Sequence, residues 1–463
     1  MAGKHINKNL GAICAEANQA QSIFDCVLSI DHLGTQDDET KKTLLRESTM
    51  RFANLTTSVF LTIFGIASQL AAEEGLKAWS STEPFPSQTV YFPGTETLHP
   101  DEMRVVACGT GMPQPRMKQA GSCFLVELGN GDKFIFDLGK GSSDHIAALG
   151  IPTDQLNKVF ISHLHFDHAG DFPAFWLTRG VNAARQPLFL WGPGGGQNPK
   201  WGIRGWTETI KQAWAWDVAT RESSGDPRST QLTVTELDWK KVNNLFYEEN
   251  GVKIYSIPTI HIDQSIGYIL EWNGLKFAYS GDTAPNKWFL EHASGADFAI
   301  HESMLPPELW LEKYSMSPQA AVMSGTQGHT TPRAFGKIMD IARPRMAVAS
   351  HFQNDFDTAS LMEKEIRVHY DGPLSLATDF MVWNITKENI TTRMTVPNPE
   401  TYPPPAQVAA EPPIVDENTY QWDPFSFSGF EPQTSAVTNE VVKEFNEQQG
   451  TDIEPILSNI PFK

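Results

Sequence analysis

KVFISHLHFDH, residues 158–168, carries the strongest structural and chemical signal in this sequence. The apolar run at 158–160 predicts a buried strand, and the polar stretch follows where that strand ends. His163 and His165 are two residues apart, and such side chains on an extended segment point the same way. We therefore expect His163 and His165 to bind one cation, and Asp167 and His168 to face a second one. A lone histidine is more often structural, but four ligand-type residues at this spacing favour a metal site.

The H-x-H-x-D-H pattern resembles the signature of the metallo-β-lactamase superfamily. Four positions before or after this pattern in the chain also match the family: Asp137 in KFIFDLGKG, His261, Asp282 in SGDT and His351 in AVASHF. The resemblance implies that Asp282 bridges two metal ions and that Asp137 supports their ligands from behind. The implied ligands are His163, His165, Asp167, His168, His261, Asp282 and His351. Each later motif alone would be weak, but their order after the signature makes the set specific.

Four further motifs narrow the resemblance to the ribonuclease Z and arylsulfatase-like branch. They are CGTGMP at 108–113, HES at 301–303, GHT at 328–330 and LATDFMVWNI at 376–385. In that branch the histidine that matches His329 protonates the leaving group, and the glutamate that matches Glu302 lies beside it. From the residues alone, His329 could equally be a loop histidine that caps a helix, and Glu302 part of a structural ion pair.

Short apolar strands alternate with helical stretches between residues 103 and 385, separated by turns rich in glycine, asparagine and aspartate. This mixture predicts two sheets with helices outside them, not an all-β sandwich. We therefore expect an α/β (α+β) fold: the metallo-β-lactamase αββα sandwich, with two mixed β-sheets flanked by helices. The predicted hydrolase domain covers 103–394.

The 463 residues include 36 basic and 55 acidic ones, which gives a net charge of −19. This balance argues against nucleic acid as a partner. Residues 399–463 hold eleven acidic residues and two lysines, and prolines are frequent there. We expect 395–463 to be an acidic, proline-rich tail, mostly extended or partly disordered. Four cysteines exclude a disulfide scaffold, and they form no CxxC motif.

The N-terminal region resembles an export signal. Arg51 precedes an apolar run at 59–67, and small residues follow at Ala71 and Ala72. We expect 1–49 to be an unstructured leader or a mis-called start, 50–72 a signal peptide and 73–102 a connector. The protein would then be exported, to the periplasm or outside the cell. The run is too short for a stable membrane span; the alternative is an ordinary buried helix after a disordered leader.

The segment 171–217 follows the metal motif and is unusually rich in tryptophan. Its tryptophans are Trp176, Trp191, Trp201, Trp206, Trp214 and Trp216, and its arginines include Arg179, Arg185 and Arg204. Because the segment follows the metal loop directly, we expect a substrate wall that includes Trp176, Trp191 and Arg179, where an arginine could meet a substrate anion. The alternative is that the tryptophans pack in the core.

We expect an enzyme that hydrolyses ester bonds, with a small phosphodiester or aryl sulfate ester as substrate. The resemblance implies two Zn²⁺ ions, although iron and manganese also suit these ligands. A hydroxide that bridges the metals would attack the ester, Asp167 would hold this nucleophile, and His329 would protonate the leaving oxygen with Glu302 nearby.

Four alternatives stay open at this point: a lactonase or other esterase, a secondary-metabolite hydrolase, a tRNA 3′-processing endonuclease and a non-catalytic metal-binding protein. Endonucleases of this branch carry a long tRNA-gripping arm, which bacterial members insert between the strand of Gly267-Tyr268 and the motif of Asp282. Here 269–280 reads as one tight hairpin with Asn273-Gly274 at its turn, so the endonuclease is disfavoured. The sequence also leaves a homo-oligomer open.

Overall fold

The computed structural model describes residues 90–454, except 183, 223–224, 405, 407, 415, 417–418, 422, 428 and 430–431. The predicted leader at 1–49 and signal peptide at 50–72 lie outside these residues, as does most of the connector at 73–102, and they stay predictions. In the described part of the chain, no helix has both the length and the apolar character that a membrane span requires.

The described strands form two mixed sheets. The nine-stranded sheet has the order β1-β16-β15-β2-β3-β4-β5-β6-β7. Its strands are β1 (Val90–Tyr91), β16 (Ile390–Thr395), β15 (Met381–Ile385), β2 (Met103–Gly109), β3 (Cys123–Leu128), β4 (Lys133–Phe136), β5 (Lys158–Phe160), β6 (Leu188–Pro193) and β7 (Leu232–Leu237). The seven-stranded sheet consists, in spatial order, of β14 (Leu374–Leu376), β13 (Met346–Ser350), β12 (Phe298–Glu302), β11 (Leu275–Tyr279), β10 (Ile266–Trp272), β9 (Val252–Pro258) and β8 (Asn244–Glu249).

The two sheets face each other across one hydrophobic core, to which both contribute side chains. Successive side chains on a strand point to opposite faces. On β2, Val105 belongs to the core between the sheets, whereas Val106 packs in the cluster under the helices on the outer face. This double burial explains why the strand is apolar along most of its length, since both of its faces are covered.

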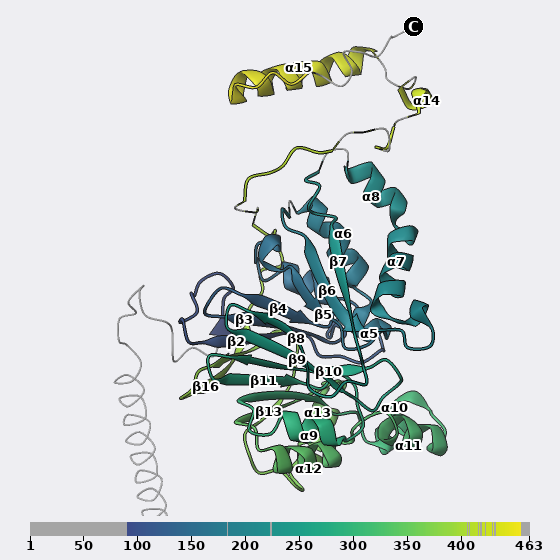
Figure 1. Ribbon diagram of the computed structural model, residues 1–463, viewed down its shortest axis with the longest axis vertical. Coiled ribbons are helices and arrows are strands. Elements are labelled where there is room, and N and C mark those ends of the chain that lie inside the picture. The colour runs from purple at the N-terminus through teal and green to yellow at the C-terminus, as the bar shows by residue number, and fades with distance from the viewer. Residues whose placement is uncertain are drawn as a thin grey trace, which may run out of the picture. The chain divides into compact units, whose positions relative to one another are not determined.

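Helices cover the outer face of each sheet (Figure 1). The nine-stranded sheet is covered by α4 (Ser142–Ala147), α6 (Phe172–Val181) and α7 (Ile203–Ala213), and the other sheet by α9 (Lys287–His292), α12 (Pro332–Ala342) and α13 (Phe356–Ile366). The remaining helices are α5 (Phe166–Ala169), α8 (Ala215–Glu222), α10 (Pro307–Tyr314), α11 (Pro318–Thr326), α14 (Pro424–Phe427), α15 (Pro432–Gln449) and the short 3₁₀ turns η1 (Thr153–Gln155) and η2 (Pro199–Trp201). The predicted αββα sandwich of two mixed sheets flanked by helices is confirmed.

Both ends of the described chain contain regular structure outside the bounds of the predicted domain. Strand β1, which precedes residue 103, pairs in parallel with β16. The acidic tail contains the 18-residue helix α15, although composition predicted mostly extended chain there. Pro432 begins this helix and Gly450, with φ +68, follows it. Proline at a helix start and glycine after its end are ordinary helix boundaries, and in the prediction the acidity and proline content of the whole tail outweighed this local signal.

Candidate metal centre

Loops at the ends of six strands carry the candidate site. In one sheet β9, β11, β12 and β13 run in the same direction, because β10 is antiparallel to both β9 and β11 and the later pairs are parallel. In the other sheet β4 and β5 are parallel. Parallel strands end at the same edge of a sheet, so residues far apart in the sequence can meet there. The residues at or after these ends are Asp137, His163, His165, Asp167, His168, His261, Asp282, Glu302 and His351.

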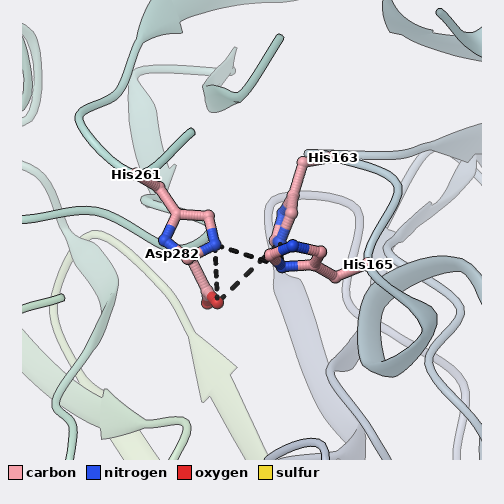
Figure 2. Close-up of side chains that lie close together, drawn as sticks. All are labelled: His163, His165, His261 and Asp282. Atoms are coloured by element: carbon pink, nitrogen blue, oxygen red, sulfur yellow. Dashed lines mark hydrogen bonds and ion pairs between the residues drawn. The ribbon is translucent and has the colours of Figure 1, made fainter. Parts of the chain in front are cut away.

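The first ligand cluster consists of His163, His165, His261 and Asp282. Figure 2 shows His163 and His165 approaching from one side and His261 and Asp282 from the other. His165 Nδ1 lies 3.0 Å from His163 Nε2 and 3.1 Å from His261 Nε2. Asp282 Oδ2 lies 3.9 Å from His163 Nε2 and 3.8 Å from His261 Nε2. One N–H cannot satisfy all these neighbouring acceptors, whereas a cation between them can.

The second ligand cluster consists of Asp167, His168, His351 and the same Asp282. His351 Nε2 lies 3.1 Å from Asp167 Oδ2, 3.3 Å from Asp282 Oδ2 and 3.4 Å from His168 Nε2. His168 Nε2 lies 3.2 Å from Asp282 Oδ1. The carboxylate of Asp282 therefore belongs to both clusters, with Oδ2 near ligands of each and Oδ1 near His168, as a bridging ligand requires.

The spacing and chemistry of these atoms fit metal ions. Ligands at about 2.0–2.1 Å from a tetrahedral zinc ion are separated from one another by roughly 3.3 Å, which is close to the 3.0 to 3.9 Å found here. Asp167 Oδ1 is buried and accepts no hydrogen bond from the described residues. Asp282 Oδ1 is also buried and accepts no hydrogen bond within the described part of the chain, although His168 Nε2 lies 3.2 Å away. Buried carboxylate oxygens without donors are costly unless a cation is present.

Contacts behind the clusters fix which nitrogen of two histidines faces the cation. His168 Nδ1 lies 2.8 Å from Asp137 Oδ2, and His261 Nδ1 lies 2.8 Å from the carbonyl oxygen of Gly328. Each Nδ1 donates its proton to an oxygen, so that Nε2 is left with a lone pair in the cluster. Asp137 is itself held by Ser162 Oγ at 2.7 Å and Tyr279 Oη at 2.6 Å. The structure thus places Asp137 behind the ligands.

Burial and charge set the protonation of the ring nitrogens. Burial holds the pKa of His163 well below its ordinary value and lowers the pKa of His261 to about 4. Both rings are therefore neutral near pH 7, which is the form that binds metals. Burial opposes a charged His168 too, but Asp282 and Asp167 outweigh it and raise its pKa well above the ordinary value. Without a metal ion, His168 therefore also carries a proton on Nε2, and a cation held by the second ligand cluster would take the place of that proton.

His329 and Glu302 form a pair at the edge of the two clusters. His329 Nδ1 lies 3.0 Å and 3.1 Å from the two oxygens of Glu302, and 3.9 Å from Asp282 Oδ2. Burial disfavours the charged ring, but the Glu302 carboxylate outweighs it and raises the pKa of His329 to about 9. Near pH 7 the ring therefore holds a proton next to the ligands, as a general acid must.

Two tryptophans predicted to face the substrate lie elsewhere. Trp176 on α6 is 3% exposed, and its Nε1 donates to the carbonyl oxygen of Thr230 at 3.1 Å. Trp191 on β6 stacks on Phe160 with ring centroids 4.8 Å apart and packs against the core between the sheets. The predicted wall is wrong at these positions, because both rings fill the sandwich and do not line the site.

Arg179 is the third residue that the prediction placed wrongly. Its side chain is fully buried. The guanidinium donates to the carbonyl oxygens of Thr153, Leu156 and Gln186 at 3.0, 3.0 and 2.6 Å. These hydrogen bonds all go to backbone acceptors, and the nearby charge is the carboxylate of Asp154, so Arg179 ties loops together and cannot meet a substrate anion.

The tryptophan-rich segment does reach the site, through residues that the prediction did not select. An open pocket of about 340 Å³ lies beside His165. Its lining residues are Leu164, His165, Lys200, Trp201, Trp206, Ile262, Asp263 and Gln264. We call this the aromatic pocket. The sequence signal that could have found it is the turn NPKW at 198–201, which follows three glycines and presents a tryptophan outside any apolar pattern.

Comparisons with known proteins find one family profile and several sequence relatives that match this chain. The family profile "Anti-Pycsar protein Apyc1" matches residues 103–308. Ribonuclease Z of Mycolicibacterium gilvum is 30% identical over 204 residues, which cover 43% of this chain and 68% of that protein. Ribonuclease Z of Mycobacterium sp. strain KMS is 26% identical over 257 residues, or 54% of this chain and 84% of that one.

Two solved structures are also similar. The human short-form tRNase Z has a TM-score of 0.44 and 20% identity, and covers 60% of this chain and 98% of its own. The metallo-β-lactamase fold protein YhfI of Bacillus subtilis has a TM-score of 0.47 and 17% identity, and covers 62% of this chain and 100% of its own. The sequence relatives, the sheet order and the histidine clusters of this chain all point to one family. The chain belongs to the ribonuclease Z-like family of metallo-β-lactamase-fold hydrolases.

Proposed function

We propose that this protein is a phosphodiesterase that hydrolyses a small phosphodiester at a pair of divalent cations, with zinc as the expected metal. The observation that carries the proposal is the carboxylate of Asp282, which belongs to both ligand clusters: Oδ2 lies near His163 and His261 of the first and His351 of the second. A protonated histidine, His329, stands beside it. Ligands, bridge and acid together make up the machinery of a hydrolase.

The two ligand clusters divide the work of holding the cations. His163, His165 and His261 would hold one ion, and Asp167, His168 and His351 the other, with Asp282 between them. When bound, such a pair of cations lowers the pKa of a water molecule and stabilises negative charge on the attacking and leaving oxygens. Imidazole and carboxylate ligands suit zinc, and they also suit iron or manganese.

His329 and Glu302 supply the proton that the leaving group needs. The leaving oxygen of an unactivated phosphodiester departs as an alkoxide, which is a poor leaving group without a proton. His329 would donate that proton, and Glu302 keeps the ring charged and oriented through Nδ1. This leaves Nε2 of the ring as the donor atom. Asp167, whose Oδ1 receives no hydrogen bond from the described residues, would orient the attacking water.

We prefer a phosphodiester to other esters as the substrate for two reasons. It is anionic, and the relatives of this chain also favour it. Two cations and a charged His329 favour an anionic ester over a neutral lactone. The relatives that match this chain are named ribonuclease Z, and a ribonuclease cleaves phosphodiester bonds. An aryl sulfate ester shares the anionic character and is the second candidate substrate.

A tRNA 3′-processing activity is the second candidate function, favoured by the names of those relatives. The hairpin at the expected place of the tRNA-binding arm argues against it. Strands β10 and β11 pair directly up to Trp272 and Leu275, and only Asn273 and Gly274, both with positive φ, form the turn. We expect little or no cleavage of a precursor tRNA with a 3′ trailer. Efficient cleavage at one site would show that tRNA, and not a small phosphodiester, is the substrate.

The test combines metal analysis of the purified protein with a panel of chromogenic substrates. The panel contains phosphodiester, phosphomonoester, sulfate and lactone substrates. We expect two equivalents of metal per chain and the highest kcat/KM on a phosphodiester. A preference for the lactone or the sulfate would reassign the substrate class. Two bound metal ions without turnover on any substrate would contradict the enzyme and favour a metal-binding interaction protein.

A further inference from the structure

The aromatic pocket is attached to the metal centre through His165, which belongs both to its lining and to the first ligand cluster. His329 is not among its lining residues. The ring of His261 neighbours both histidines, since its centroid lies 5.0 Å from that of His165 and 4.6 Å from that of His329. The pocket therefore adjoins the metal centre at His165 and does not include the proposed general acid.

Closely packed glycines fix the turn that carries Trp201. A Cβ on Gly195 would lie 2.3 Å from the carbonyl oxygen of Asn198, and a Cβ on Gly202 would lie 2.1 Å from the nitrogen of Gly195. Neither position tolerates a side chain, so the glycine turn and η2 can pack backbone against backbone. Asn198 also accepts hydrogen bonds from the backbone of Lys200, through its side chain, and of Trp201, through its carbonyl oxygen. The backbone of Trp201 is thus held in place while its side chain remains 65% exposed.

The pocket offers one large apolar surface with a polar margin. Trp201 and Trp206 contribute indole rings, and Ile262 contributes an exposed aliphatic side chain. Lys200 adds a positive charge, and Gln264 adds an amide that can donate and accept hydrogen bonds. Exposure of an indole alone proves little, since other tryptophans of this segment are also exposed. What distinguishes Trp201 is its position in a pocket that shares a wall with a metal ligand.

We propose that the aromatic pocket binds an aromatic ring of the substrate, on the substituent that stays attached to phosphorus after hydrolysis. The inference rests on the proposed phosphodiesterase function. If His329 protonates the leaving oxygen, the leaving group lies on its side, and the other substituent extends past His165. A pocket of about 340 Å³ has room for one such ring. The ring stacks on Trp201, and Lys200 and Gln264 contact its polar edges or a nearby anion.

Three substrates with one leaving group test this assignment. Methyl, phenyl and thymidine-5′ p-nitrophenyl phosphates all release p-nitrophenolate and differ only in the substituent that remains. We expect kcat/KM for the phenyl and thymidine esters to exceed that for the methyl ester by roughly five- to 100-fold, the usual size of a stacking contribution. The better of these two esters identifies the ring as a simple aryl group or a nucleobase. Equal kcat/KM for all three substrates would overturn the proposal.

Trp201→Ala supplies the matched variant. It should lower kcat/KM for the two aromatic esters to about the value for the methyl ester, mainly by raising KM. The metal content should not change. Trp201→Phe, which keeps a ring, should retain most of the preference. Trp216→Ala removes an equally large tryptophan that is 72% exposed on α8 and outside the pocket, and should change nothing. An equal loss on all three esters in Trp201→Ala would mean that the pocket holds the leaving group, contrary to the proposal.

Binding without turnover separates this inference from the proposed function. Calorimetry with phenyl phosphate and methyl phosphate measures the aromatic preference directly. We expect tighter binding of phenyl phosphate to the unmodified protein and equal binding of both ligands to Trp201→Ala. If the aromatic preference appears but no phosphodiester is hydrolysed, the proposed function fails and the pocket assignment stands. If phosphodiesters are hydrolysed without any aromatic preference, only the pocket assignment fails.

Discussion

The metal centre and the aromatic pocket meet at His165 and are built in opposite ways. In the metal centre, His163, Asp282 and His351 are at most 3% exposed, and further side chains or carbonyl groups hold several of the ligands from behind. In the aromatic pocket, Trp201 is 65% exposed and only its backbone is held. The difference teaches that the part expected to do the chemistry has little freedom to change, whereas the part expected to recognise the substrate can vary without disturbing the fold.

The largest effect is expected from Asp282→Ala. This change removes a ligand from both clusters, so metal content should fall well below two per chain and kcat should fall by at least roughly 10³-fold, more than loss of a supporting residue costs. Metal analysis and rate measurement on the same sample check both. Asp357→Ala removes an exposed carboxylate on α13 and serves as the control. Two tightly bound ions in Asp282→Ala would refute the bridging role.

His329→Ala should separate chemistry from metal binding. Because His329 lies outside both ligand clusters, we expect both metals to remain. Turnover should fall by roughly 10²–10⁴-fold, the usual contribution of a general acid. The loss should shrink for leaving groups that depart easily without a proton, such as p-nitrophenolate. His369→Ala, at an exposed histidine, provides the control.

Three outcomes distinguish the possible roles of His329. Loss of metal in His329→Ala would make it a ligand, as its closeness to Glu302 and His351 permits. An equal loss of turnover on all leaving groups, with metal retained, would mean that His329 positions the substrate. A small loss everywhere would show that the pair with Glu302 is structural.

Asp137→Ala should have a smaller effect on the same centre. The change leaves all ligands present but frees the ring of His168, so metal affinity should fall by roughly 10–100-fold. Tyr279→Phe removes one hydrogen bond to Asp137 and should weaken binding less. Competition with a chelator of known affinity measures both variants. Unchanged affinity in Asp137→Ala would show that the packing of the loop, and not this carboxylate, orients His168.

Arg179→Ala should leave catalysis intact and reduce stability. The change leaves three backbone carbonyl groups without their donor, and we expect the free energy of unfolding to fall by about 2–4 kcal/mol. Activity per folded molecule should not change, since Arg179 is buried away from the site. Arg204→Ala, at a mostly exposed arginine, should change stability by less than about 0.5 kcal/mol. Urea unfolding of both variants checks the difference. A selective loss of substrate affinity in Arg179→Ala would restore its predicted role at the site.

The sequence predicts these two regions unequally well, for a physical reason. Three histidines and an aspartate within six residues at the end of a strand have few structural uses, so the motif at 163–168 is enough to indicate a metal site. Tryptophan and arginine have many uses. Whether Trp176 or Trp201 faces the substrate depends on which side of its element meets the sheet, and that is settled by packing between segments far apart in the sequence. Arg179 is misleading because a fully buried arginine that binds only carbonyl groups is rare.

The fold, too, is predicted well from the sequence in one part and poorly in another. The strand pattern predicts the two mixed sheets, because strands buried on both faces are apolar nearly throughout, as β2 is. Composition misses helix α15, since the prolines and acidic residues of the tail average out the local helix signals at Pro432 and Gly450.

The measurement that tests the central claim most directly is a zinc titration of the metal-free protein, with phosphodiester hydrolysis followed at each step. If Asp282 joins two cations in one catalytic centre, activity should stay low through the first equivalent of zinc and rise as the second one binds. Chelation should then abolish it. Full activity at one equivalent, or hydrolysis that persists in the metal-free protein, would contradict the paired metal centre.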